Sequence, residues 1–260
     1  MRPLSIVTTS WDDGDPKDLK IAELLWARQL RGTFYVPNIG YLGKKVLTAK
    51  DLQSLCEEGF EIGGHSVSHI SLPGLPAERL KHEVGRCKEK LQQIINNPVI
   101  MFCYPYGHYT RPVLREVQNQ GYVGARTVSM LATAPEFLAF EMPTTLQAYP
   151  HPPLTYLRNL GKNRNVSGVW AYLTRFRRSK TWVELGKQLF REVFENGGIW
   201  HLYGHSWEIE ELNLWDDLRE LLDYVCHRPL VKYVNNGQLV QRANPNLIND
   251  ETELPAISSK

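Results

Sequence analysis

Short runs of β-branched and aromatic residues alternate with amphipathic stretches through the first half of the chain. Such runs are typical of strands, and we predict strands at residues 6–11, 33–36, 60–62, 99–104 and 122–127. The stretches between them carry apolar residues at every third or fourth position, which predicts helices. These helices cover residues 16–28, 48–59, 80–94 and 113–121.

The second half of the chain is less regular. It predicts strands at residues 138–142 and 199–203 and helices at residues 182–193 and 214–225. Residues 149–180 hold a proline cluster and many basic side chains, which indicates an insertion or a lid, and residues 244–260 indicate a polar tail. The alternation of strands and helices predicts an α/β fold, in which a parallel sheet covered by helices is either open or closed into a barrel.

Composition supports a folded domain and excludes several kinds of partner. Hydrophobic residues make up 42% of the 260 residues, which is enough for a core and too many for a disordered chain. The 30 basic and 28 acidic side chains leave a net charge of +2, which gives no reason to expect nucleic acid or an anionic membrane as partner. Four scattered cysteines indicate reduced thiols. With no signal peptide or membrane span in the pattern, we expect a cytoplasmic protein.

Residues 11–14 (WDDG) close the first predicted strand with two adjacent carboxylates before a glycine. Neighbouring side chains on an extended chain point to opposite sides. Asp12 and Asp13 could therefore do different jobs, one binding a cation and the other accepting a proton. Aspartate and glycine are also ordinary turn residues, so this motif alone leaves a simple turn as the alternative.

Residues 63–69 (GGHSVSH) follow the third predicted strand and place His65 and His69 four positions apart. On a helical segment this spacing puts both rings on one face, where they could reach one zinc ion. Position 66 holds no glutamate, so the HExxH pattern is absent and a general base has to come from elsewhere. Two unrelated surface histidines are the alternative.

Two further clusters follow later strands. Residues 102–107 (FCYPYG) run from a strand into a proline–glycine loop. Residues 202–208 (LYGHSWE) place His205 after the last predicted strand, where an imidazole could act as an acid. Trp207 or Glu208 could orient its ring, or could simply begin the next helix.

The position of the clusters matters more than any one of them. Each falls where a strand is predicted to end, and parallel barrels carry their chemistry at the carboxyl ends of the strands. His201 differs, because it lies inside a predicted strand, where we expect a hydrogen-bonded core histidine.

Together the four motifs resemble those of the polysaccharide deacetylases, the NodB-homology or carbohydrate esterase family 4 group. Their order and spacing match over roughly residues 5–235. The resemblance implies a distorted (β/α) barrel of seven strands, as one domain over residues 1–243. It also implies hydrolysis of N-acetyl or O-acetyl groups on sugars.

The resemblance assigns roles to six residues. It implies that Asp13, His65 and His69 hold a divalent metal ion. It implies further that Asp12 is the base and His205 the acid. The backbone N–H of Tyr106 would donate to the oxyanion.

The chain departs from the family pattern in two places. The arginine usual in the third motif is Cys103 here, which leaves Asp12 without its expected ionic partner. Arg126, near the end of the next predicted strand, could supply the charge from a neighbouring position, and an ordinary surface ion pair is the alternative. Trp207 and Glu208 stand where the general motif specifies no residue, which indicates a distinct subgroup.

The ligand set predicts zinc, although cobalt, nickel or manganese would also fit. The predicted substrate is an N-acetylated carbohydrate. Basic side chains within residues 158–178 either form a solvated face or favour an anionic substrate, such as a nucleotide- or lipid-linked sugar. Since no export signal is seen, we favour an intracellular precursor over mature cell wall.

Other functions would use the same residues. A deformylase of formamido sugars, an amidase of small non-sugar amides and an O-acetyl esterase would differ only in the pocket. A carbohydrate-binding homologue without turnover is a further alternative, which the change to Cys103 allows. A binding module has no need of the five carboxylate and imidazole groups. Their presence argues against this alternative, and they are those of Asp12, Asp13, His65, His69 and His205. The sequence does not indicate the oligomeric state.

Overall fold

The computed structural model describes residues 4–40, 43–152, 154–156, 158 and 179–243. Its centre is a parallel sheet in which seven strands follow the order β5-β4-β3-β2-β1-β7-β6, while β8 pairs with β1 beside that path. The strands are β1 (Ser5–Asp12), β2 (Gly32–Val36), β3 (Glu61–Gly64), β4 (Met101–Cys103), β5 (Gly124–Arg126), β6 (Leu146–Gln147), β7 (Gly198–Gly204) and β8 (Val231–Tyr233).

The sheet curls until its two edges approach each other. Arg126, the last residue of β5, forms an isolated bridge with Met142. Four residues later, Leu146 of β6 pairs with Leu202 of β7. Residues 142–147 therefore connect the two edges of the sheet, and the predicted distorted barrel of seven strands is confirmed.

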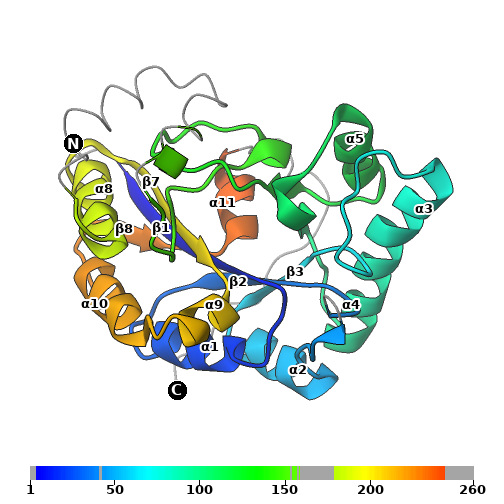
Figure 1. Cartoon of the computed structure of the whole chain (residues 1–260), viewed down its shortest axis with the longest axis horizontal. Helices are drawn as coiled ribbons and strands as arrows, with labels where there is room; N and C mark the ends of the chain where they lie inside the picture. Colours follow the sequence, from blue (N-terminus) through cyan, green and yellow to red (C-terminus); the bar gives the residue numbers. More distant parts are fainter. Residues whose placement is uncertain (1–3, 41–42, 153, 157, 159–178, 244–260) are drawn as a thin grey trace.

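Helices cover the outer side of the strands, which occupy the centre of the molecule (Figure 1). They are α1 (Asp18–Trp26), α2 (Ala49–Glu57), α3 (Ala77–Lys81), α4 (Cys87–Ile95), α5 (Arg111–Asn119), α8 (Trp182–Asn196), α9 (Ser206–Glu211) and α10 (Trp215–Val225). The helix α11 (Asn236–Ala243) differs, because its Leu239 and Val240 pack into a buried cluster with Ile6, Tyr35 and Met101. The capping box expected at Thr48 and Asp51 opens α2, with both of its hydrogen bonds present. A π-helical turn, η2 (His82–Arg86), lies between α3 and α4.

Alternation along β1 sends its side chains to two environments. All eight residues of this strand are buried. Val7 and Trp11 belong to the main core, while Ile6 belongs to a second cluster that contains residues of β2, β4 and β7. Asp12 lies on the same side of the strand as Ile6. Its carboxylate therefore enters the barrel interior at the carboxyl end of β1.

The strand predicted at residues 138–142 is wrong. The chain there forms a 3₁₀ turn, η4 (Ala139–Glu141), and Leu138 is 69% exposed. The strand comes later, at β6, which pairs with β7, and Thr145 just before it donates its backbone N–H to the carbonyl oxygen of His201. A partner strand, and not the local residue pattern, decided which part of this segment is extended.

Besides β6, the pattern missed β8 and α11, and two predicted segments lie largely or wholly outside the described residues. The pattern gave no sign of β8 or of α11, whose first residue Asn236 bonds to Thr8 and Tyr35 in the barrel. Most of the predicted lid (149–180) and all of the predicted tail (244–260) lie outside the described residues. Among the described residues, no helix has the length and apolar content required to cross a membrane.

Candidate functional site

The residues of the four motifs meet at the carboxyl ends of neighbouring strands. Asp12 is the last residue of β1, and His65 directly follows β3. Arg126 is the last residue of β5, and His205 directly follows β7. Because all these strands are parallel, their carboxyl ends share one edge of the barrel, as the sequence predicted.

Asp13, His65 and His69 form a compact group. One carboxylate oxygen of Asp13, Oδ1, lies 3.0 Å from Nε2 of His69 and 3.5 Å from Nε2 of His65. Nδ1 of His65 lies 2.8 Å from the carbonyl oxygen of Cys103. A carbonyl oxygen only accepts, so Nδ1 carries a proton, which leaves Nε2 as the ring nitrogen that could bind a cation.

This group fits a divalent cation. Its three ligand atoms lie within 4.8 Å of one another. Apart from the approach of the two imidazole nitrogens, the buried Asp13 Oδ1 accepts no hydrogen bond from the described residues, and a buried carboxylate oxygen without a donor is costly. Two imidazole nitrogens and one carboxylate oxygen are ligands typical of a catalytic zinc site, where a fourth position stays open.

The helical placement predicted for His65 and His69 is wrong. Both lie in a loop, where φ is 64° at Ser66 and 49° at His69. Glu83, in the turn η2, accepts hydrogen bonds from the N–H and the hydroxyl of Ser68 at 2.9 and 2.7 Å. A buried carboxylate from another element therefore holds the loop, so a tertiary contact brings the two rings together.

Arg126 reaches the carboxylate of Asp12. One nitrogen of its guanidinium, Nη2, bonds to both oxygens of that carboxylate. Both side chains are buried, and Arg126 is fully so. Burial raises the pKa of Asp12, but the charge and hydrogen bond of Arg126 together with the nearby His65 and His205 outweigh this effect and hold the pKa below its usual range. Asp12 is thus an ionised carboxylate in the interior.

The position of Arg126 follows from strand register. Cys103 at the end of β4 pairs directly with Arg126 at the end of β5. The guanidinium is therefore displaced by one strand from the place where the family pattern has its arginine. Cys103 also approaches Asp12, with 3.8 Å between Sγ and Oδ2, but burial raises the pKa of the thiol well above its usual value.

A second set of residues that could hold a metal fits less well. It consists of Asp12, His65 and Cys103. Arg126 already neutralises both oxygens of Asp12. Since a metal requires the thiolate form of cysteine, the raised pKa of Cys103 disfavours this set further.

His205 is held by Glu208. Nδ1 of the ring donates to Oε2 of Glu208 at 2.7 Å, while Nε2 lies 3.9 Å from Oδ2 of Asp12. Burial lowers the pKa of His205, but the bond with Glu208 and the charges of Asp12 and Asp13 reverse this and raise it to about 9. The imidazolium form, which carries a proton to give, is therefore favoured at neutral pH.

Glu208 is itself held by Gln147 at the end of β6. The amide Nε2 of Gln147 donates to Oε2 of Glu208 at 3.0 Å. Tyr203 and His151 both donate to the amide oxygen of Gln147, each at 2.8 Å. Gln147 was not predicted as a site residue, because a single glutamine at a two-residue strand gives no recognisable signal in the sequence.

Tyr106 borders the histidine pair. Its hydroxyl donates to the backbone carbonyl oxygen of His69 at 3.2 Å, and the two rings lie 4.8 Å apart. The Tyr106 backbone has φ of 58°, and its side chain is 45% exposed. His201 is the buried core histidine that was predicted, since it bonds to Ser10 and to the carbonyl oxygen of Pro143.

Comparison with known proteins gives a family match over the first half of the chain. Residues 3–125 match a family model described as polysaccharide deacetylase. A candidate polysaccharide deacetylase of Bacillus subtilis (strain 168) is 22% identical over 117 residues. That match covers 45% of this chain and 42% of the relative, so less than half of the relative's length is spanned.

Solved structures share the fold over nearly the whole chain. A candidate polysaccharide deacetylase from Mycobacterium smegmatis aligns with a TM-score of 0.69 and 15% identity, covering 98% of this chain and 96% of that one. A carbohydrate esterase family 4 pseudoenzyme from Bacillus anthracis aligns with a TM-score of 0.52 and 13% identity, covering 92% and 66%. At these identities the likeness extends to the fold alone, so chemistry has to be argued from the side chains.

Proposed function

We propose that this chain, which belongs to the polysaccharide deacetylase family as its motifs predict, is a metal-dependent hydrolase. Its reaction would remove an acetyl or other short acyl group from an amino sugar. The observation that carries the proposal is that one set of three residues and two pairs of residues lie together at one edge of the barrel. They are the cation-binding set around Asp13, the Asp12–Arg126 pair and the His205–Glu208 pair.

Asp13, His65 and His69 would hold the cation. When bound, a divalent ion polarises the acyl carbonyl and makes the attacking water more acidic. Zinc is the first candidate, and cobalt, nickel or manganese would fit the same ligands.

The other residues would move protons and stabilise charge. Asp12 accepts a proton from the attacking water, and Arg126 keeps this carboxylate ionised until then. The backbone N–H of Tyr106 donates to the oxyanion of the tetrahedral intermediate. His205 then gives the proton on Nε2 to the leaving nitrogen, and Glu208 stabilises the imidazolium beforehand.

Replacing Asp12 with asparagine tests the proposed base. The amide keeps the shape but accepts protons poorly, so we expect kcat for acetate release from short N-acetyl oligosaccharides to fall by about 10²–10⁴-fold. Cation binding, measured by calorimetry, should persist because Asp12 is not in the cation-binding set. Turnover equal to that of the wild type would show that the base is another group.

Replacing Glu208 with glutamine tests the proposed acid. Loss of the carboxylate should lower the pKa of His205, whose present value of about 9 depends on the Glu208 bond. Since His205 acts in its protonated form, the alkaline limb of the kcat profile should move to lower pH, and the acid limb should stay. An unchanged alkaline limb would rule His205 out as the titrating acid. Glu210→Gln, on the same helix but outside the site, is the control.

Substrate identity distinguishes the remaining candidates. Acetate released from N-acetylated sugars supports the proposal, while formate released from formamido sugars would identify a deformylase. Release only from O-acetylated sugars would identify an esterase. Cation binding without release from any of these substrates would favour a binding protein without turnover.

A further inference from the structure

We propose that Trp207 is a positioning residue for the cation, because its indole N–H fixes the carboxylate of Asp13 in the orientation that a metal ion would require. Nε1 of Trp207 donates to Oδ2 of Asp13 at 3.0 Å. The inference rests on the proposed function in one respect, since it takes Asp13, His65 and His69 as the cation ligands.

The two oxygens of Asp13 face different partners. Oδ1 lies near Nε2 of both His65 and His69, and Oδ2 faces the indole of Trp207. An indole N–H only donates and never accepts. It therefore engages Oδ2 without competing for the histidine nitrogens, and it leaves Oδ1 as the oxygen presented to the cation.

Orientation matters here because the backbone of Asp13 gives little restraint to its carboxylate. Asp13 lies just beyond the end of β1, with φ of 77°, outside the hydrogen-bonded ladder. A carboxylate in such a turn could rotate, or offer both oxygens to one ion. Groups that bond to metal ligands typically fix their orientation, and losing one usually weakens metal binding by about 10–100-fold.

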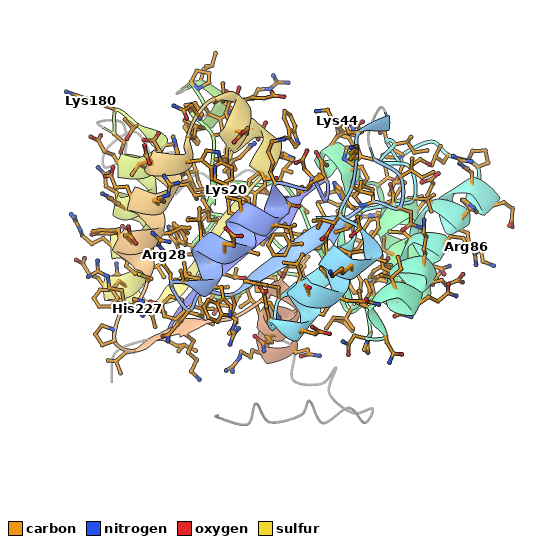
Figure 2. All side chains as sticks on the ribbon, turned by 90° about the horizontal axis from the view of Figure 1, so that it is seen from below. Lys20, Arg28, Lys44, Arg86, Lys180 and His227 are labelled. Atoms are coloured by element: carbon orange, nitrogen blue, oxygen red, sulfur yellow. The ribbon has the colours of Figure 1, made fainter. Side chains whose placement is uncertain are left out.

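The rest of helix α9 holds Trp207 in place. His205 precedes the helix, and Glu208 in its first turn bonds to the His205 ring at 2.7 Å. Ile209 in the same turn is fully buried. The Lys44 ammonium lies over the indole, 4.4 Å from the ring centroid. Figure 2 shows Lys44 at the rim of the molecule, far from His227 at the opposite end.

This arrangement links two parts of the site through three consecutive residues, 205–207. His205 is the proposed acid, and Trp207 reaches the proposed cation ligand Asp13, whose position in the sequence is 194 residues away. Any shift of the first turn of α9 would move both contacts together. Trp207 also lies beside the ring of His205, with 5.5 Å between the ring centroids, so metal affinity rather than turnover is the readout that isolates its role at Asp13.

The test compares two separate substitutions, each of which removes one indole N–H. Trp207→Phe deletes the donor to Asp13 and keeps an aromatic ring. Trp215→Phe is the control, because Trp215 also donates from Nε1 to a carboxylate, that of Glu210, at 2.6 Å. Trp215 also has a lysine ammonium over its ring, that of Lys20, at 3.8 Å. The two substitutions therefore remove the same kind of contact inside and outside the site.

The measurement is the affinity for Zn²⁺ and Co²⁺ alone, by calorimetry, together with the melting temperature of the metal-free protein. We expect Trp207→Phe to lower the binding affinity for both metals by about 10–100-fold. Trp215→Phe should bind both metals with wild-type affinity. The melting temperature without metal should be the same in wild type and Trp207→Phe. Wild-type affinity in Trp207→Phe would overturn the inference.

A second variant covers the case in which Trp207→Phe perturbs folding. Replacing Trp207 with β-(3-benzothienyl)alanine exchanges the N–H for sulfur and keeps the two fused rings. It should show the same loss of affinity, and normal affinity would again overturn the inference. If the wild type itself binds neither metal, the proposed function fails. If the wild type binds the metals and both Trp207 variants bind them with the same affinity, only the proposed role of Trp207 fails.

Discussion

Replacing His69 with alanine is expected to remove both the bound cation and the turnover of the protein. The imidazole of His69 makes the shortest approach to Asp13 Oδ1, at 3.0 Å. A catalytic zinc site has three protein ligands and one open position, so two ligands would leave the ion mainly to water. We expect about one ion per chain in the wild type and none retained by His69→Ala after dialysis, measured by elemental analysis.

A matched histidine serves as control for this result. His227 is exposed and has φ of 54°, close to the 49° of His69. His227→Ala therefore carries a similar backbone cost for placing alanine in the left-handed region. It should keep both the ion and the turnover. Retention of one ion and full acetate release by His69→Ala would exclude the proposed cation site.

Replacing Arg126 with alanine is expected to abolish most of the turnover while the cation still binds. The substitution leaves Asp12 as an unpaired carboxylate in the barrel interior, and breaking a buried ion pair in this way typically costs about 3–5 kcal/mol of stability. Asp12 would respond by taking up a proton, which removes its capacity as a base. Near-normal acetate release by Arg126→Ala would reject the proposal that Arg126 replaces the missing arginine.

An exchange of residues separates the catalytic effect from the loss of stability. Cys103 and Arg126 are direct partners on neighbouring strands. The double variant Cys103→Arg with Arg126→Cys therefore returns a guanidinium to the same barrel edge, one strand away. We expect it to recover a measurable part of the turnover lost in Arg126→Ala. If the double variant recovers no turnover and yet has the melting temperature of the wild type, the guanidinium charge has to come from β5.

A surface pair provides the energetic control. Arg28 approaches Asp223 with 2.7 Å between Nε and Oδ1, but the Asp223 side chain is 62% exposed. Exposed pairs of this kind contribute about 0–1 kcal/mol. Arg28→Ala should therefore change the free energy of unfolding much less than Arg126→Ala, in a denaturant titration of the metal-free proteins.

The sequence alone determined the strands that carry the site and the edge at which it lies. Hydrophobic runs and turn residues predicted the ends of β1, β3, β4, β5 and β7 to within about two residues, because alternation and turn formation are local properties of the chain. Parallel strands then required those ends to share one edge. The candidates Asp12, Asp13, His65 and His205 could be named for this reason before any contact between them was known.

Only the tertiary structure decided which side chains meet. The pairing of Arg126 with Asp12 depends on the order and register of β5, β4 and β1, which no local pattern encodes. The bond from Trp207 to Asp13 joins residues 194 positions apart. Spacing suggested a helix for His65 and His69, yet Glu83 from a neighbouring helical segment holds them in a loop. Contacts between distant segments form when the whole chain packs, and packing decides the partners of a buried charge.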